Sequence, residues 1–243
     1  MKCYDHPTHL AKNLQKKERY EIFSLFVNKN KLRFNEIEKQ IKVRSNILAY
    51  HLDQMINDGL LIKIENEYQL TIDSEKYIPI FRHILNNSHT PLPVVLIVLL
   101  NNENQILLLK RNIRPYKNYW GLIGGKIKFE ENYKDASIRL IKQKTNINGN
   151  FLSVNNISNE KVMFNDNVKH SFILFMTKMQ TSTNEFIDSR YGELKWFNLD
   201  ELNENEIIPS DLWLIKNKLN EKININDFEM NENDGNINNF KIN

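Results

Sequence analysis

The residues best placed to do chemistry lie in one stretch, WGLIGGKIKFEENYKDASIRLIKQKTNI, at positions 120–147. On a helix, Leu140, Gln143 and Lys144 stand at i, i+3 and i+4 and therefore share one face. Three carboxylates on such a face would hold Mg²⁺, a hard cation that takes oxygen ligands and bridges to phosphate. This face instead offers an apolar group, a neutral amide and a cation. The pattern predicts no bound metal and direct pairing of Lys144 with a phosphate.

The same stretch resembles the Nudix box, in which a glycine, five residues, a glutamate and seven residues precede Arg-Glu-apolar-x-Glu-Glu-x-Gly-apolar. The positions that match this motif are Gly125, Glu131, Arg139, Ile141 and Ile147. The positions that depart from it are Leu140, Gln143, Lys144 and Asn146. The first three departures fall where the family places its catalytic glutamates. The resemblance implies that Glu131 and Arg139 pair and brace the loop against the helix, while the metal ligands are lost.

The flanking segments extend this resemblance over residues 91–220. Residues 107–111 resemble the strand before the box, and Trp120 with Gly124 and Gly125 resembles the family's Trp-x-x-Pro-Gly-Gly turn. Further along, 172–176 reads as a buried strand, 193–202 as a closing strand and turn, and 209–211 as the start of a final helix. The resemblance implies a Nudix α/β/α sandwich with a mixed sheet over 93–220, in which Gly124, Gly125, Arg139 and Trp120 are structural.

The first third of the chain has the pattern of a winged helix-turn-helix domain, expected over residues 13–82. Apolar stripes predict a first helix around 20–26 and a second around 34–41. Ser45 is a suitable N-cap for a third helix over 46–58, and Gly59 is a suitable stop. The apolar runs 60–64 and 68–71 then predict a hairpin, the wing.

Residues 45–71 are similar to the recognition helix and wing of arsenic-repressor-like regulators, which implies binding of double-stranded DNA. The candidate DNA-binding residues are Lys42, Arg44, Ser45, Asn46, Tyr50 and Lys63. In the alternative interpretation, Asn46 and Tyr50 are solvated helix residues. His51 lies beside the apolar stripe and is expected to be structural.

The whole chain therefore reads as an α+β protein of two domains. It has 243 residues, a net charge of +3 and one cysteine, and no apolar run long enough to span a bilayer. Without an apolar signal core, a cytoplasmic location and no membrane contact are expected. Residues 83–92 read as a linker, and the Asn-rich segment 221–243 is expected to be disordered. Because neither domain is strongly basic, DNA affinity would come from local arrangement and from a homodimer.

Three functions remain open. The first is a transcription regulator whose degenerate Nudix domain senses an ADP-ribose-like compound or nucleotide sugar and needs no cofactor. Its candidate ligand-binding residues are Arg111, Tyr116, Lys126, Glu131, Gln143 and Lys144. The second is an active Nudix hydrolase with Mg²⁺, whose carboxylates would come from Glu130, Glu131, Glu160 or Asp166. The third is a protein- or RNA-interaction module without catalysis.

Overall fold

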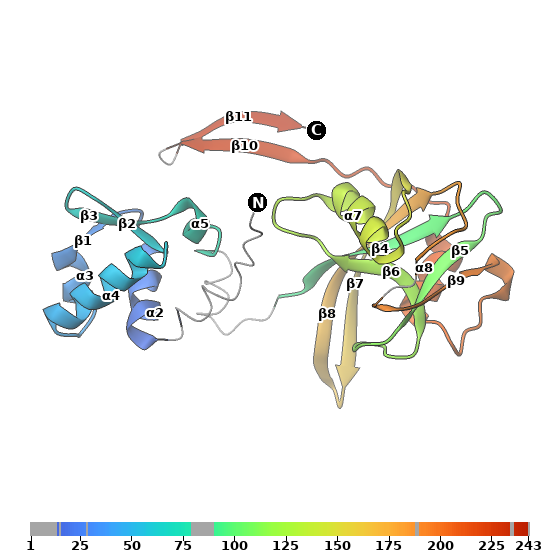
Figure 1. Cartoon of the computed structure of the whole chain (residues 1–243), viewed down its shortest axis with the longest axis horizontal. Coiled ribbons are helices and arrows are strands. Elements are labelled where there is room, and N and C mark those ends of the chain that lie inside the picture. Colours follow the sequence, from blue (N-terminus) through green and yellow to red (C-terminus); the bar gives the residue numbers. More distant parts are fainter. Residues whose placement is uncertain are drawn as a thin grey trace. The chain divides into compact units, whose positions relative to one another are not determined.

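The computed structural model describes residues 14, 16–27, 29–78, 90–187, 190–233 and 236–242. The chain forms two compact units, Met1–Thr90 and Pro91–Asn243 (Figure 1). Most of the expected linker at 83–92 lies outside the described residues. No helix in the described ranges is long and apolar enough to cross a membrane.

The N-terminal unit consists of short helices and a small sheet. Its elements are α2 (Lys17–Phe26), β1 (Leu32–Arg33), α3 (Phe34–Gln40), α4 (Ser45–Asn57), β2 (Leu61–Ile64), β3 (Glu67–Leu70) and α5 (Ile72–Glu75). The three strands pair antiparallel in the order β1-β3-β2. Hydrophobic periodicity predicted neither the two-residue strand β1 nor the four-residue helix α5, because elements so short have no period.

One apolar cluster holds this unit together. Phe23 of α2, Ile37 of α3 and Leu52 of α4 are fully buried and pack in the same cluster. Gly59 follows α4 with a φ of +73°, the left-handed conformation that glycine adopts without strain, and so ends the helix as expected. His51 is buried with an exposure of 6%, in agreement with a structural role. Desolvation lowers the pKa of its imidazole, although Glu18 nearby acts in the opposite direction.

The expected N-cap of α4 is wrong by one residue. Arg44 occupies the cap position, and Ser45 is already the first helical residue. The Ser45 hydroxyl donates a 2.5 Å hydrogen bond to the Glu38 carboxylate on α3 instead of accepting one from its own helix. The sequence alone does not determine whether a serine near a helix start bonds to an amide of its own helix or to a side chain of another helix.

The C-terminal unit is built on a six-stranded sheet in the order β7-β8-β4-β6-β5-β9. Its strands are β4 (Leu92–Leu100), β5 (Ile106–Arg111), β6 (Trp120–Lys126), β7 (Asn150–Phe164), β8 (Asn167–Gln180) and β9 (Gly192–Phe197). Strand β4 pairs parallel with β8 and antiparallel with β6, so the sheet is mixed, as expected. The hairpin β7–β8 extends well beyond the other strands (Figure 1).

Alternation along the strands supplies an apolar surface to each face of the sheet. In β5, Leu107 and Leu109 join the cluster under α7 (Tyr133–Thr145), while Ile106 and Leu108 join the cluster under α8 (Pro209–Lys218). A short 3-10 helix, η1 (Leu199–Glu201), lies between β9 and α8. The two clusters place one long helix on each face, which gives the expected three layers.

The C-terminal tail differs from the expectation of disorder. Residues Phe228–Asn233 and Asn236–Ile242 form an antiparallel hairpin, β10–β11, in which Phe228 and Phe240 stack with ring centroids 5.4 Å apart. The segment before it is attached to the domain, because Ile223 bridges to Val154 of β7. Asparagine-rich composition suggested disorder, but a few well-spaced apolar residues are enough to pair two short strands.

Candidate functional site

Helix α7 is fixed by an N-cap side chain and by an ion pair to the preceding loop. Asn132 caps it by accepting hydrogen bonds from the amides of Lys134 and Asp135, each at 3.0 Å. The predicted pair of Glu131 and Arg139 is present: Arg139 Nε donates to Glu131 Oε2 at 2.7 Å, and its Nη2 donates to Oε1. These hydrogen bonds hold the pKa of the Glu131 carboxyl below its usual value. Because Arg139 Nη2 also donates to the Lys126 carbonyl, the pair ties the loop to both β6 and α7.

Two glycines of β6 let neighbouring elements approach closely. A Cβ on Gly125 would lie 2.6 Å from Cδ2 of Leu140, and a Cβ on Gly124 would lie 2.5 Å from the Val95 carbonyl oxygen. Leu140 is buried against Gly125 and belongs to the apolar cluster under α7. Where the Nudix box carries a glutamate, this chain therefore carries a core residue that packs the helix onto the sheet.

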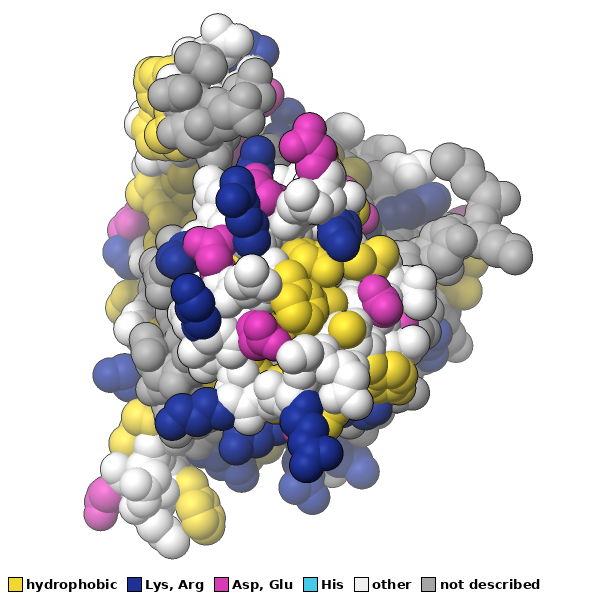
Figure 2. Space-filling view, turned by 90° about the vertical axis from the view of Figure 1, so that its left-hand side faces the viewer, with side chains coloured by type: hydrophobic (Ala, Val, Ile, Leu, Met, Phe, Trp, Pro, Cys, Tyr) yellow, Lys and Arg dark blue, Asp and Glu magenta, His cyan; other side chains and the backbone are white. Residues whose placement is uncertain are grey.

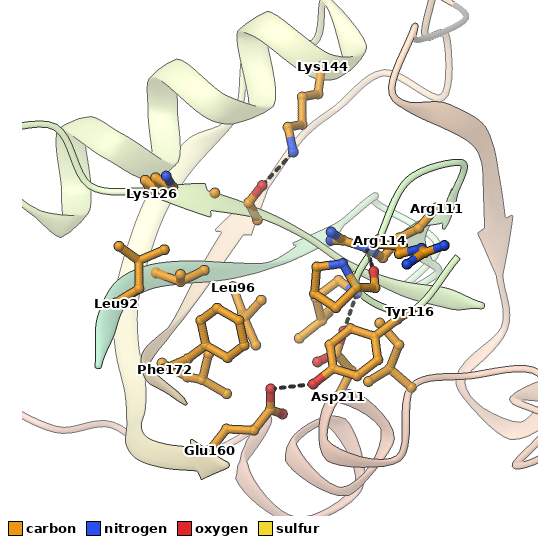
Figure 3. Close-up of a pocket in the computed structure, with 17 residues that line it drawn as sticks. Leu92, Leu96, Arg111, Arg114, Tyr116, Lys126, Lys144, Glu160, Phe172 and Asp211 are labelled. Carbon is orange, nitrogen blue, oxygen red and sulfur yellow. Dashed lines mark hydrogen bonds between the residues drawn. The ribbon is translucent and has the colours of Figure 1, made fainter. Parts of the chain in front are cut away.

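Lys144 leaves the same helix one turn later and points to the sheet. Its Nζ donates a 2.5 Å hydrogen bond to the Gly124 carbonyl oxygen (Figure 3). Burial, together with the positive charges of Arg111 and Arg139, lowers the pKa of this amine from 10.5 to about 8. Gln143 lies on the exposed side of the helix, where its amide oxygen accepts a hydrogen bond from Arg139.

A cavity of about 300 Å³ opens beside these residues. Its cationic lining residues are Arg111, Arg114, Lys126 and Lys144. Its apolar lining residues include Leu92, Val94, Leu96, Phe172 and Leu174 (Figure 3). A cavity with cations in one part and an apolar wall in another fits a ligand that combines anionic groups with a flat apolar ring.

The far end of the cavity carries acidic and phenolic groups. The Tyr116 hydroxyl donates a 2.7 Å hydrogen bond to Glu160 Oε1, and burial together with this carboxylate raises the pKa of the phenol. Asp211 at the start of α8 is buried and accepts a 2.7 Å hydrogen bond from the Leu122 amide. Desolvation raises the pKa of Asp211 to about 7, although the Leu122 amide favours the charged form.

The structure brings together four of the six candidate ligand-binding residues: Arg111, Tyr116, Lys126 and Lys144. It does not place Glu131 or Gln143 in the cavity, because Arg139 takes up both side chains. No sequence motif assigned Arg114 or Asp211 to a site, and Glu160 was a candidate only for a hydrolase. Arg114 comes from the loop after β5, Asp211 from α8 and Glu160 from β7. No spacing in the sequence links the three residues.

The Mg²⁺ that a Nudix box implies does not fit these residues. At the three glutamate positions the chain carries a buried leucine, an exposed amide and a lysine whose amine lines the cavity. In the described part of the chain, no group of three or more His, Cys, Asp or Glu residues could hold a metal ion. Glu130 is exposed outside the cavity, and Asp166 lies in the turn between β7 and β8.

The candidate DNA-binding residues all lie on the N-terminal unit. Lys42, Arg44, Ser45, Asn46, Tyr50 and Lys63 are all exposed. Ser45 is held by Glu38, and Asn46 Oδ1 accepts a hydrogen bond from the Ile47 amide. Figure 2 shows Lys and Arg side chains around an apolar patch on this unit, with acidic side chains between them. The face in view in Figure 2 is therefore of mixed charge, in agreement with the small net charge of the chain.

Comparison with solved structures gives chains that are similar to this one at low sequence identity. The Nudix domain of Shewanella oneidensis NrtR, crystallised with ADP ribose, is 18% identical over 56% of this chain and 93% of its own, with a TM-score of 0.46. A MutT protein from Methanosarcina mazei Go1 is 17% identical over 55% of this chain and 99% of its own, with a TM-score of 0.46. A MutT protein from Bacillus halodurans is 21% identical over 62% of this chain and 97% of its own, with a TM-score of 0.47.

Comparison with curated proteins finds no match. The family model of the NUDIX domain matches residues 90–216, a range that includes every residue lining the cavity. This match spans more than half of the chain, and the protein therefore belongs to the Nudix family.

Proposed function

We propose that this protein is a DNA-binding transcription regulator whose Nudix domain binds a nucleotide diphosphate metabolite without hydrolysing it. The observation that carries the proposal is the position of Lys144. Its amine lies in the cavity at a motif position where the family has a glutamate. A cation there pairs with phosphate directly and repels Mg²⁺, so binding would not depend on metal.

The rest of the cavity supports a ligand of the ADP-ribose or nucleotide-sugar type. Arg111 and Arg114 supply planar donors that suit the oxygens of a diphosphate. Tyr116 and the wall formed by Leu92, Leu96 and Phe172 offer apolar surface for a base. Glu160 accepts hydrogen bonds and would select a hydroxyl or amino group on the ligand.

The regulatory part of the proposal rests on the N-terminal unit. Helices α3 and α4 and the hairpin β2–β3 occur in the order that a winged helix-turn-helix requires. The exposed Arg44 and Asn46 at the start of α4 and Tyr50 near its middle would contact DNA, with Lys63 of the hairpin on phosphate. We propose a homodimer as the binding form, because one unit with so little net charge would bind DNA weakly.

The test is a thermal-shift screen of the purified full chain against ADP-ribose, NAD, nucleotide sugars and nucleoside triphosphates, each with Mg²⁺ and with EDTA. We expect at least one compound to stabilise the protein equally in both. At a ligand concentration of about 100 times Kd, the gain is roughly 2.7 kcal/mol. R111Q should abolish it, whereas K117Q, a change to an exposed lysine outside the cavity, should not.

A hydrolase is the second candidate, because Glu160 and Asp211 place two carboxyl groups in the same cavity. In that case stabilisation would require Mg²⁺, and E160Q would abolish turnover. If no nucleotide stabilises the protein and no DNA is bound selectively, the interaction-module alternative is favoured instead.

A further inference from the structure

The amine of Lys144 has properties beyond those of a phosphate-binding cation. Its hydrogen bond goes to a neutral acceptor, the Gly124 carbonyl, and its Nζ lies 4.9 Å from the centroid of the Tyr191 ring. Within the described residues, no carboxylate lies within 4.0 Å of this Nζ. The charges that act on it are those of two other cations, Arg111 and Arg139.

Burial and the two neighbouring cations raise the neutral fraction of this amine, although the contact with the Tyr191 ring favours the cation. With a pKa of about 8, roughly one Lys144 side chain in ten is uncharged near neutral pH, against fewer than about one in a thousand for an ordinary lysine. A neutral amine carries a free lone pair and is a nucleophile. Desolvation and a neighbouring cation are the two conditions that activate a lysine toward carbonyl compounds.

The cavity also provides the means to hold an electrophile next to this amine. Arg111 is oriented by its own hydrogen bond from Nε to the Pro115 carbonyl, at 2.8 Å, which leaves its other N–H groups for a ligand. Arg114 and Lys126 line the same cavity. A phosphate on these cations would keep the remainder of its molecule within the cavity that Lys144 also lines.

We propose that Lys144 forms a reversible imine with a phosphorylated aldehyde held in this cavity, such as the open-chain form of a nucleotide diphosphate that ends in a reducing sugar. This inference rests on the proposed phosphate binding and narrows the ligand to compounds with a free carbonyl. The Nζ lone pair forms a bond to the carbonyl carbon, and the C=O π bond opens to a carbinolamine. The oxygen then leaves as water with the two protons of the amine, and no metal or oxidant takes part.

The test is reductive trapping with a simple probe. The full-length protein is incubated with pyridoxal 5′-phosphate, reduced with borohydride, and digested for peptide mass spectrometry. Lys142, an exposed lysine on the same helix, is the internal control. We expect Lys144 to be labelled about tenfold faster than Lys142 or more, because far more of its amine is neutral. K144R keeps the cation but cannot form the imine. Labelling at position 144 should therefore disappear, and only the slower labelling of the other lysines should remain.

Two results would overturn the inference. One is labelling of Lys144 that is no faster than that of Lys142 in protein whose circular dichroism is native. The other is equal labelling of Lys144 by pyridoxal, which lacks the phosphate, since the cations would then play no part. If ADP-ribose still stabilises the protein in EDTA while Lys144 is not trapped, the imine fails and the proposed function stands. If ADP-ribose does not stabilise the protein and Lys144 is not trapped, both the imine and the proposed function are contradicted.

Discussion

At the scale of single residues, Glu131 and Arg139 show how the box keeps its structural part. Their side chains are 12% and 23% exposed, so the pair is largely shielded from water. Glu131 also accepts a 2.7 Å hydrogen bond from the Lys128 amide, and Arg139 reaches the Lys126 carbonyl. The pair therefore organises the loop between β6 and α7 rather than a metal ion.

Removal of this carboxylate should destabilise the domain in a pH-dependent way. In E131Q the Arg139 guanidinium loses its partner, at a cost of about 1–3 kcal/mol near neutral pH. Because the folded pKa of Glu131 is lowered, its contribution is complete above the unfolded value of 4.5 and is lost as the pH falls through the folded pKa. Urea unfolding should therefore show wild type and E131Q converging in acid. An equal difference at all pH values would contradict this role, and K134Q on the exposed side of α7 is the control.

Asp211 should have the opposite pH dependence. Its folded pKa is raised from 3.8 to about 7, so the stability that it contributes is complete in acid and is lost as the pH rises through the folded pKa. D211N keeps an oxygen that can accept from the Leu122 amide and removes the buried charge. We expect D211N to match wild type in acid and to be more stable above about pH 8, by on the order of 2–4 kcal/mol. D200N, at an exposed acid in η1, should show no such gain.

At the scale of elements, the close contact between β6 and α7 positions Lys144. G125A would bring a Cβ to 2.6 Å from the Leu140 side chain and push the helix away from the sheet. We expect a loss of about 1–3 kcal/mol in unfolding free energy and weaker nucleotide stabilisation. L140A alone leaves a cavity and costs about 2–5 kcal/mol. The double variant G125A/L140A should lose less than the sum, and strict additivity would show that the two groups do not meet.

The sequence was sufficient for those elements whose apolar spacing is clear. Helices α3 and α4 lie where their apolar spacing predicted them, and strand β5 and the helix that begins at Pro209 lie where the family resemblance implied them. Strand β7 was not predicted, because its 15 residues mix apolar positions with Asn, Ser and Glu and are interrupted by register shifts. The tail hairpin was missed for a related reason, since its composition resembles that of disordered chains.

At the scale of the whole molecule, the cavity could be predicted only in part. Lys144 and Gly125 lie in one motif whose spacing fixes their shared location. Arg114, Glu160 and Asp211 meet there only because the loop after β5, strand β7 and helix α8 converge on one region of the sheet. Such convergence depends on the strand order, which local patterns do not contain.

The proposed regulator requires that its two activities be coupled. A ligand changes DNA affinity only if it binds the DNA-competent and incompetent forms with different affinities. We expect a nucleotide that binds the cavity to change the affinity for operator DNA by roughly 5- to 150-fold, measured by fluorescence anisotropy at physiological salt. R44Q should weaken sequence-selective binding by about tenfold or more, while K29Q, an exposed charge remote from α4 in sequence, should not. Identical DNA affinity with and without bound nucleotide would contradict the proposed coupling between nucleotide binding and DNA binding.

The most direct measurement of the central claim is isothermal titration of ADP-ribose, or of the best compound from the thermal-shift screen, into the full-length protein. The titration is made once in Mg²⁺ and once in EDTA, with R111Q as the cavity variant. We predict the same Kd in both buffers, no hydrolysis product and no binding to R111Q. A Kd that requires Mg²⁺, together with release of cleaved nucleotide, would contradict the account and identify the protein as a hydrolase.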